Sequence, residues 1–243
     1  MGGFFYQLGR LAGPSVRKGK WLWKSLTGSD DELLQAEEEV GADLDRAFLA
    51  GVSLDPESEL QELAAALTGK LAQKVKNKKR KFRPRVLASE AVNAFALPGG
   101  YIYLTRGLVE CVERSSDELA FVIAHEMGHV IRQDPMQRVV TEAAVGAALK
   151  LLARKGPASY LRSVGAKLLQ SAYSQDRELG ADELAVRLLR ASGFPPQAAV
   201  ALLEKLSARA KDTSLQATLL GPYFSTHPPF ELRIRRIRRM LKA

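Results

Sequence analysis

Two histidines four positions apart, with a glutamate directly after the first, are the residues best suited to chemistry. They are His125, Glu126 and His129, inside the apolar run Ala120-Phe-Val-Ile-Ala-His-Glu-Met-Gly-His-Val-Ile. The run follows Ser115-Ser-Asp-Glu, a capping-box pattern that predicts a helix from this point to about residue 133. Residues four apart share one helical face, so both imidazoles can bind one tetrahedral metal ion, typically zinc. From its neighbouring position, Glu126 can act as general base for the water that the metal activates.

The alternative interpretation of this motif is a helix with two incidental histidines and an exposed glutamate. Two observations favour the metal site. The chain has three histidines, and two of them belong to this motif. Gly128, a poor helix residue, lies inside the predicted helix beside His129. A close approach by another segment or by a substrate would explain a glycine at that position.

A catalytic zinc of this kind needs a third protein ligand and an open fourth position. The run Asp176-Arg-Glu-Leu-Gly-Ala-Asp, on a second predicted helix, offers Glu178 and, one turn later, Asp182. We expect Glu178 to be the third ligand and Asp182 to accept a hydrogen bond from a ligand imidazole, which fixes its tautomer. Two acidic residues at this spacing are, when considered alone, more typical of a solvated face. The small residues Gly180 and Ala181 would let the two helices pack closely.

The third histidine, His227, precedes Pro228 and Pro229 and therefore lies on a rigid, non-helical approach to the last helix. A lone histidine is often incidental. Beside a zinc site, however, His227 becomes a candidate either to stabilise a tetrahedral oxyanion or to cover the open metal position. Tyr223 is a further candidate for the oxyanion role.

Composition excludes several classes of protein. With 46% hydrophobic and 26% charged residues in 243, the chain is neither disordered nor a membrane bundle. No apolar run approaches the ~20 residues that cross a bilayer, and the start lacks a secretory pattern. We therefore expect a cytoplasmic or peripheral membrane protein. The single cysteine, Cys111, lies in an apolar helical pattern and is interpreted as a buried structural thiol.

The formal net charge of +9 comes largely from two basic runs, residues 74–85 and 233–242. No nucleic-acid-binding motif accompanies them, so no nucleic-acid partner is predicted. In the second run Ile234, Ile237 and Leu241 recur at helical spacing between arginines, which predicts an amphipathic terminal helix with a solvated basic face. The alternative is a basic surface for anionic membranes or acidic partners.

The chain is predicted to divide into three parts. Residues 1–28 form an aromatic and basic leader that packs on the catalytic domain, contacts a membrane surface or serves as a removable pro-segment. Residues 29–84 form a helical region, with a capping box at Ser29 and Glu32. In residues 85–243, short strands at 86–88, 92–97 and 101–104 precede helices at 136–155, 158–191, 196–210 and from 229. This order predicts an α+β fold, mostly helical with a small, mainly antiparallel sheet.

Four motifs together resemble the gluzincin metallopeptidases of the HtpX-like and CAAX prenyl-protease kind, in their soluble form. They are the run from Asn93 to Leu108, the helix of His125 and His129, the Glu178–Asp182 segment and Ser225-Thr-His-Pro, and they span about residues 85–241. The resemblance implies a zincin-like domain with one zinc ion. It also implies an edge strand where an extended peptide pairs beside the metal, with Asn93, Ala94, Phe95 and Ala96 as substrate contacts. His227 is expected near the active site, as a transition-state donor or a plug.

The sequence therefore predicts a zinc-dependent endopeptidase that cleaves extended or misfolded polypeptides, with Glu126 activating the attacking water. The transmembrane helices of the integral-membrane relatives and a lipoprotein signal cysteine are not found, so a role on membrane proteins does not carry over. A chaperone-like, peptide-binding module with a plugged or latent zinc site is the alternative. The oligomeric state is not predicted.

Overall fold

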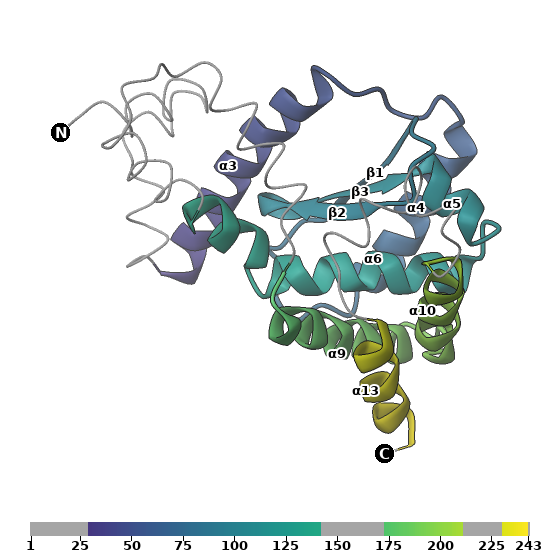
Figure 1. Cartoon of the computed structure of the whole chain (residues 1–243). Helices are drawn as coiled ribbons and strands as arrows, with labels where there is room; N and C mark the ends of the chain where they lie inside the picture. The colour runs from purple at the N-terminus through teal and green to yellow at the C-terminus, as the bar shows by residue number, and fades with distance from the viewer. Residues whose placement is uncertain (1–28, 142–172, 211–229, 243) are drawn as a thin grey trace, which may run out of the picture.

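The computed structural model describes residues 29–141, 173–210 and 230–242. The leader, Tyr223 and His227 lie outside these ranges. Residues 142–172, which include parts of the helices predicted for 136–155 and 158–191, also lie outside them. The elements, in chain order (Figure 1), are α3 (Asp30–Leu49), α4 (Ser58–Ala72), β1 (Arg83–Leu87), β2 (Ala94–Leu97), the 3-10 turn η1 (Pro98–Gly100), β3 (Tyr101–Thr105), α5 (Arg106–Cys111), α6 (Ser116–Ile131), α9 (Gln175–Ala191), α10 (Gln197–Ala210) and α13 (Phe230–Lys242). A further helical segment covers residues 134–141. The predicted α+β class, dominated by helices, is confirmed.

The small sheet has three strands in the order β1-β3-β2, which places β2 at an edge as predicted. β2 and β3 form an antiparallel hairpin through η1, where Gly99 and Gly100 take φ values of 74° and 79°. β1 instead runs parallel to β3, so the sheet is mixed rather than mainly antiparallel. The expectation failed because β1 does not pair with the next strand in sequence but with the one after it.

Side chains alternate between the two faces of the sheet, as a strand period of two requires. Ala94, Ala96 and Ile102 join the main core beneath the sheet, whereas Phe95 and Tyr103 face the other way. On that second face the two rings stack at 4.9 Å, and Phe48 of α3 meets Phe95 edge-on at 5.4 Å. The sheet therefore lies between α3 on one side and α6 on the other (Figure 1).

α6 is the central helix of the molecule. Ser115 caps it by accepting a hydrogen bond from the backbone N–H of Glu118, as the capping pattern predicts. Every residue from Glu118 to Val130 is buried, because α6 packs against β2, β3, α4, α9 and α10. A helix that is enclosed on all sides holds its side chains in fixed positions, which suits a helix that carries metal ligands.

α9 is shorter than the helix predicted for residues 158–191. It begins at Gln175 after Ser174, whose carbonyl accepts the backbone N–H groups of Arg177 and Glu178. Tyr173 and Ser174 are not helical, so the predicted helix is interrupted immediately before its acidic motif. α10 and α13 begin within one residue of the predicted positions.

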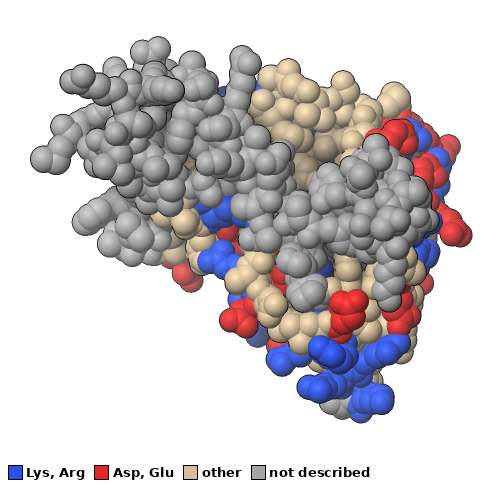
Figure 2. Space-filling model, in the orientation of Figure 1, with Lys and Arg blue, Asp and Glu red and all other residues tan. Residues whose placement is uncertain are grey.

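The cationic side chains of the two basic runs differ in what they contact. In the first, Lys79, Arg80 and Arg83 form ion pairs with acidic residues of α3, with N–O distances of 2.6, 2.7 and 2.6 Å. In the second, most cations lie on the exposed face of α13, which forms the blue cluster at the lower end of Figure 2. Among the described helices, none combines the length and apolar character needed to span a bilayer. Burial raises the pKa of the Cys111 thiol, as expected for a structural cysteine.

Candidate metal centre

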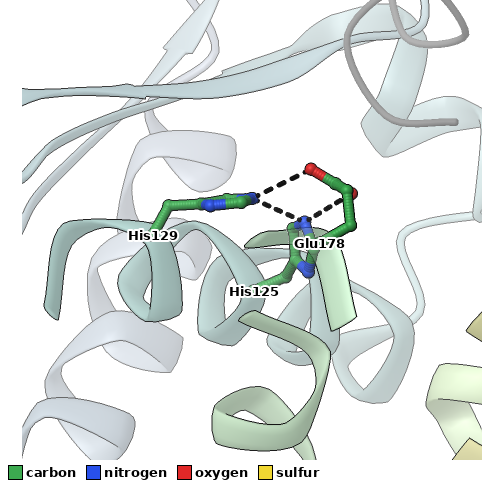
Figure 3. Close-up of side chains that lie close together, drawn as sticks. All are labelled: His125, His129 and Glu178. Carbon is green, nitrogen blue, oxygen red and sulfur yellow. Dashed lines mark hydrogen bonds and ion pairs between the residues drawn. The ribbon is translucent and has the colours of Figure 1, made fainter. Parts of the chain in front are cut away.

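The three predicted metal ligands meet where α6 packs on α9 (Figure 3). The Nε2 atoms of His125 and His129 lie 3.1 Å apart. Glu178 completes the triangle, with Oε1 at 3.2 Å from Nε2 of His129 and Oε2 at 3.5 Å from Nε2 of His125. All three side chains are at most 1% exposed. The structure therefore brings two imidazoles and one carboxylate from two separate helices to a single point.

These separations fit a tetrahedral zinc ion. Zinc binds imidazole nitrogen and carboxylate oxygen at about 2.0–2.1 Å, which places neighbouring ligand atoms of a tetrahedron about 3.4 Å apart. The 3.1 Å between the two Nε2 atoms and the 3.2 Å from Nε2 of His129 to Oε1 of Glu178 lie close to that value, and the other oxygen of Glu178 lies 3.5 Å from Nε2 of His125. Two histidines and one glutamate are also a donor set of catalytic zinc sites, in which the fourth position is left for water or substrate. By geometry and by chemistry, the residues present fit the metal.

A carboxylate contacts the Nδ1 atom of each imidazole and so orients the ring. Asp182 Oδ1 lies 2.9 Å from Nδ1 of His125, the contact that the sequence predicted for Asp182. Asp134 Oδ2 lies 2.9 Å from Nδ1 of His129, which the sequence analysis missed. In both pairs a proton on Nδ1 leaves the Nε2 lone pair directed at the metal position. The available signal for Asp134 was an acidic residue just beyond the helix end, five residues after the second histidine.

Tyr173 is a second residue that the sequence analysis missed. Its ring stacks on His129, with centroids 4.1 Å apart and planes inclined by 19°, and the Arg138 guanidinium lies 3.7 Å above its other face. Burial raises the pKa of the phenol, against the effect of Arg138, and the negative charges of Glu126, Asp134 and Glu178 raise it further. Tyr173 therefore stays protonated at neutral pH. Its role was hidden because the sequence pattern placed it inside a continuous helix.

Arg233 is the third missed residue and a correction to the predicted basic face of the terminal helix. Its side chain is 0% exposed. The guanidinium contacts Asp182 through Nε and Nη2, both at 2.8 Å, and Glu178 through Nη1, at 3.1 Å. The available signal was its spacing, three residues after Phe230 and four before Ile237, which puts it on the apolar stripe of α13. An arginine on a buried stripe requires carboxylate partners.

Glu126 is also fully buried, which contradicts the alternative interpretation of the motif with an exposed glutamate. It follows His125 on the central helix α6 and is close enough to Tyr173 for its charge to raise the pKa of that phenol. A buried carboxyl group beside a metal ligand is suited to proton transfer, because its surroundings exclude competing water.

The imidazole of His125 is expected to release a proton when zinc binds. Burial and the nearby Arg233 lower its pKa, but Asp182 and Glu178 outweigh them and raise it to about 9. Below that pH the metal-free site holds a proton that competes with zinc, so zinc affinity should rise with pH and level off above about 9. Titration calorimetry at pH 7.5, in buffers of different ionisation enthalpy, should show at least one proton released per zinc. An apparent enthalpy that is the same in every buffer would contradict this expectation.

The close helix contact beside the site explains Gly128. A Cβ at this position would lie 2.9 Å from the carbonyl oxygen of Ala181 and 3.1 Å from its Cα, so the glycine lets α6 and α9 meet. This confirms the close approach predicted from the sequence.

Gly128→Ala should therefore push the two helices apart and separate the histidines from Glu178. We expect a loss of about 1–3 kcal/mol in the free energy of unfolding and a weaker zinc affinity. Gly69→Ala, in α4, is the matched control, because a Cβ there meets nothing within 4 Å. That variant should be neutral or more stable by up to about 1 kcal/mol. Equal thermal stability of the two variants, with unchanged zinc binding, would show that the contact does not constrain the site.

A helix that carries two histidines four residues apart, with a glutamate directly after the first and a third ligand from a glutamate on a second helix, is typical of zinc metallopeptidases. The chain belongs to peptidase family M48, whose model matches residues 57–241. This membership confirms the predicted resemblance and the predicted class, a metallopeptidase. The match begins upstream of residue 85 and includes α4. The predicted division of the chain at residue 84 stays a prediction.

Several characterised proteins are similar to the chain. The mitochondrial metalloendopeptidase OMA1 of Arabidopsis thaliana is 30% identical over 59% of this chain and 28% of its own length. The metalloprotease LoiP of Escherichia coli K12 is 31% identical over 65% of the chain and 62% of its own length. A protease HtpX homolog of Thermococcus kodakarensis is 30% identical over 65% of the chain and 67% of its own length. The chain thus spans about a quarter to two thirds of these relatives.

Proposed function

We propose that this protein is a zinc-dependent endopeptidase. The observation that carries the proposal is the meeting of His125, His129 and Glu178 at a buried point, at separations that suit one tetrahedral ion. When bound there, zinc would supply a Lewis acid that polarises the scissile carbonyl and allows a water to lose its proton near neutral pH. Membership of a peptidase family supports a polypeptide substrate.

Side chains of the protein transfer the proton and orient the metal ligands. Glu126 takes the proton of the attacking water and delivers it to the leaving amine, a transfer that its buried position protects from bulk solvent. Asp182 and Asp134 keep both ligand imidazoles in the tautomer that directs Nε2 at the ion. His227 precedes α13 by three residues and is proposed to assist the oxyanion, or to cover the site as a plug, although it lies outside the described residues.

The substrate is proposed to be an extended segment of a misfolded polypeptide that pairs with β2. β2 lies at the edge of the sheet, and the Oδ1 atom of Asn93, just before it, is buried without a hydrogen-bond partner among the described residues. A narrow pocket follows this strand, lined by Phe95, Ala96, Leu97, Pro98, Pro135, Arg138, Val139 and Tyr173. Because Tyr173 stacks on His129, the pocket leads from the edge strand towards the metal centre. Edge pairing requires a backbone free of its own secondary structure, which folded proteins rarely expose.

The proposal is tested with the full-length, zinc-loaded protein and one substrate in two states. A reduced and alkylated, unfolded protein should be cleaved, and the same protein in its folded state should not. Chelation should stop cleavage and added zinc should restore it. If the zinc-loaded protein cleaves neither state but suppresses aggregation of the unfolded one, the chaperone-like alternative is favoured instead.

Peripheral membrane contact through residues 1–24 is a separate proposal, supported by Trp21 and Trp23 among basic residues. Flotation of the full-length protein with anionic vesicles tests it, with a variant in which both tryptophans are alanine as the comparison. The variant should float less. Equal recovery of both proteins in the bottom fraction would contradict membrane contact.

A further inference from the structure

We infer that Arg233 is a positioning residue that makes Glu178 bind the metal through one oxygen, Oε1, and so keeps the fourth coordination position for water. This inference rests on the proposed zinc site. Glu178 can bind zinc through one carboxylate oxygen or through both. Binding through both would occupy the position that a catalytic site must leave open.

The contacts of Glu178 distinguish its two oxygens. Oε2 lies 3.1 Å from Nη1 of Arg233 and 3.5 Å from Nε2 of His125, whereas Oε1 lies 3.2 Å from Nε2 of His129. An ion pair with a fixed guanidinium lowers the electron density available on the oxygen that it contacts and restricts rotation of the carboxylate. Oε2 is thereby held to the arginine, and Oε1 is left for the ion.

The guanidinium of Arg233 also orients His125, through Asp182. Its Nε and Nη2 atoms contact the two oxygens of Asp182, each at 2.8 Å. Oδ1 of Asp182 in turn lies 2.9 Å from Nδ1 of His125. One planar group therefore sets the position of a ligand on α6, through Asp182, and of a ligand on α9 directly. Only the forked geometry of arginine spans both carboxylates, because a lysine ammonium is a single point.

Packing alone does not explain why the buried position 233 carries an arginine. The arginines of α13 at positions 235, 236, 238 and 239 are exposed, whereas Arg233 is 0% exposed. Buried ion pairs are often no more stabilising than well-packed apolar side chains of similar volume. An apolar residue would therefore continue the stripe formed by Phe230, Ile234 and Ile237. The position is better explained by what the guanidinium touches, namely two carboxylates of the metal centre.

Cobalt substitution gives a readout that a purely structural role would not change. The visible spectrum of bound Co²⁺ is intense in a four-coordinate site and weak at higher coordination numbers. We expect a four-coordinate spectrum for the wild type and for Arg236→Met, which removes an exposed arginine from the same helix. Arg233→Met should give the weaker spectrum and a zinc affinity about 10–100-fold lower. Arg233→Lys, which keeps the charge without the fork, should recover part of the affinity but not the spectrum.

The possible failures are distinguishable. If the wild type binds no metal, the proposed function itself fails. If the wild type binds metal and Arg233→Met matches Arg236→Met in both spectrum and affinity, only the inference is overturned. If circular dichroism shows that Arg233→Met does not fold, a structure of the zinc-loaded wild type tests the inference instead. A crystal structure of the zinc-loaded protein should show one oxygen of Glu178 on the ion and the other on Arg233, and coordination by both oxygens would overturn the inference.

Discussion

Glu126→Gln is expected to lower the rate of cleavage of an unfolded polypeptide by about 10²–10⁴-fold while leaving one zinc per chain. Glutamine has nearly the same size and shape as glutamate, so the buried helix α6 should pack unchanged around it. Its amide cannot accept the proton of the attacking water, and the loss should therefore fall on kcat rather than on substrate binding. Initial rates, together with metal analysis of the same sample, measure both quantities.

Glu118→Gln is the matched control, because it makes the same chemical change on the same helix. Glu118 lies in the first turn of α6 and pairs with Lys205 at 2.9 Å, away from the metal ligands. This control should retain wild-type activity. If the zinc-loaded Glu126→Gln protein kept more than a tenth of the wild-type rate, Glu126 would not be the general base.

His125→Ala is expected to have the second large effect, the loss of bound zinc. One imidazole and one carboxylate remain, too few for a site that needs three protein ligands. Zinc per chain after dialysis should fall from one to near zero. Ligand binding at 1,000 times Kd stabilises a protein by about 4 kcal/mol, so zinc should raise the Tm of the wild type by on the order of 10 °C. The Tm of the variant should not respond to zinc.

The third histidine provides the comparison for this experiment. His227→Ala should keep one zinc per chain, because His125, His129 and Glu178 already supply three ligands. Mass spectrometry of dialysed protein measures the metal content of all three proteins. A full equivalent of zinc in His125→Ala, or its loss in His227→Ala, would assign the metal to a different set of ligands.

Features that depend on residues close in sequence could be predicted well. The capping interactions at Ser29 and Ser115 join residues three apart, and both helices begin where these patterns indicate. The pair of His125 and His129 depends only on helical periodicity. The position of Glu178 beside them, from a separate helix, could also be predicted, because a zinc site with two histidines requires a third ligand and the segment from Asp176 to Asp182 offered a carboxylate.

Features set by contacts between distant segments could not be predicted. Arg233 lies 51 residues from Asp182 in the sequence, and its neighbours are arginines that remain on the surface. The stacking of Tyr173 on His129 depends on the start of α9, which a helical pattern extending upstream concealed. The parallel pairing of β1 with β3 likewise reflects tertiary packing and leaves no signature in either strand alone.

The proposed activity depends on one ion held between α6 and α9, and anomalous diffraction at the zinc edge tests this most directly. In crystals of the full-length protein grown with one equivalent of zinc, we predict a single peak about 2.0–2.2 Å from Nε2 of His125, Nε2 of His129 and a carboxylate oxygen of Glu178. A peak bound by other residues, or none at this position despite stoichiometric zinc in solution, would contradict the account.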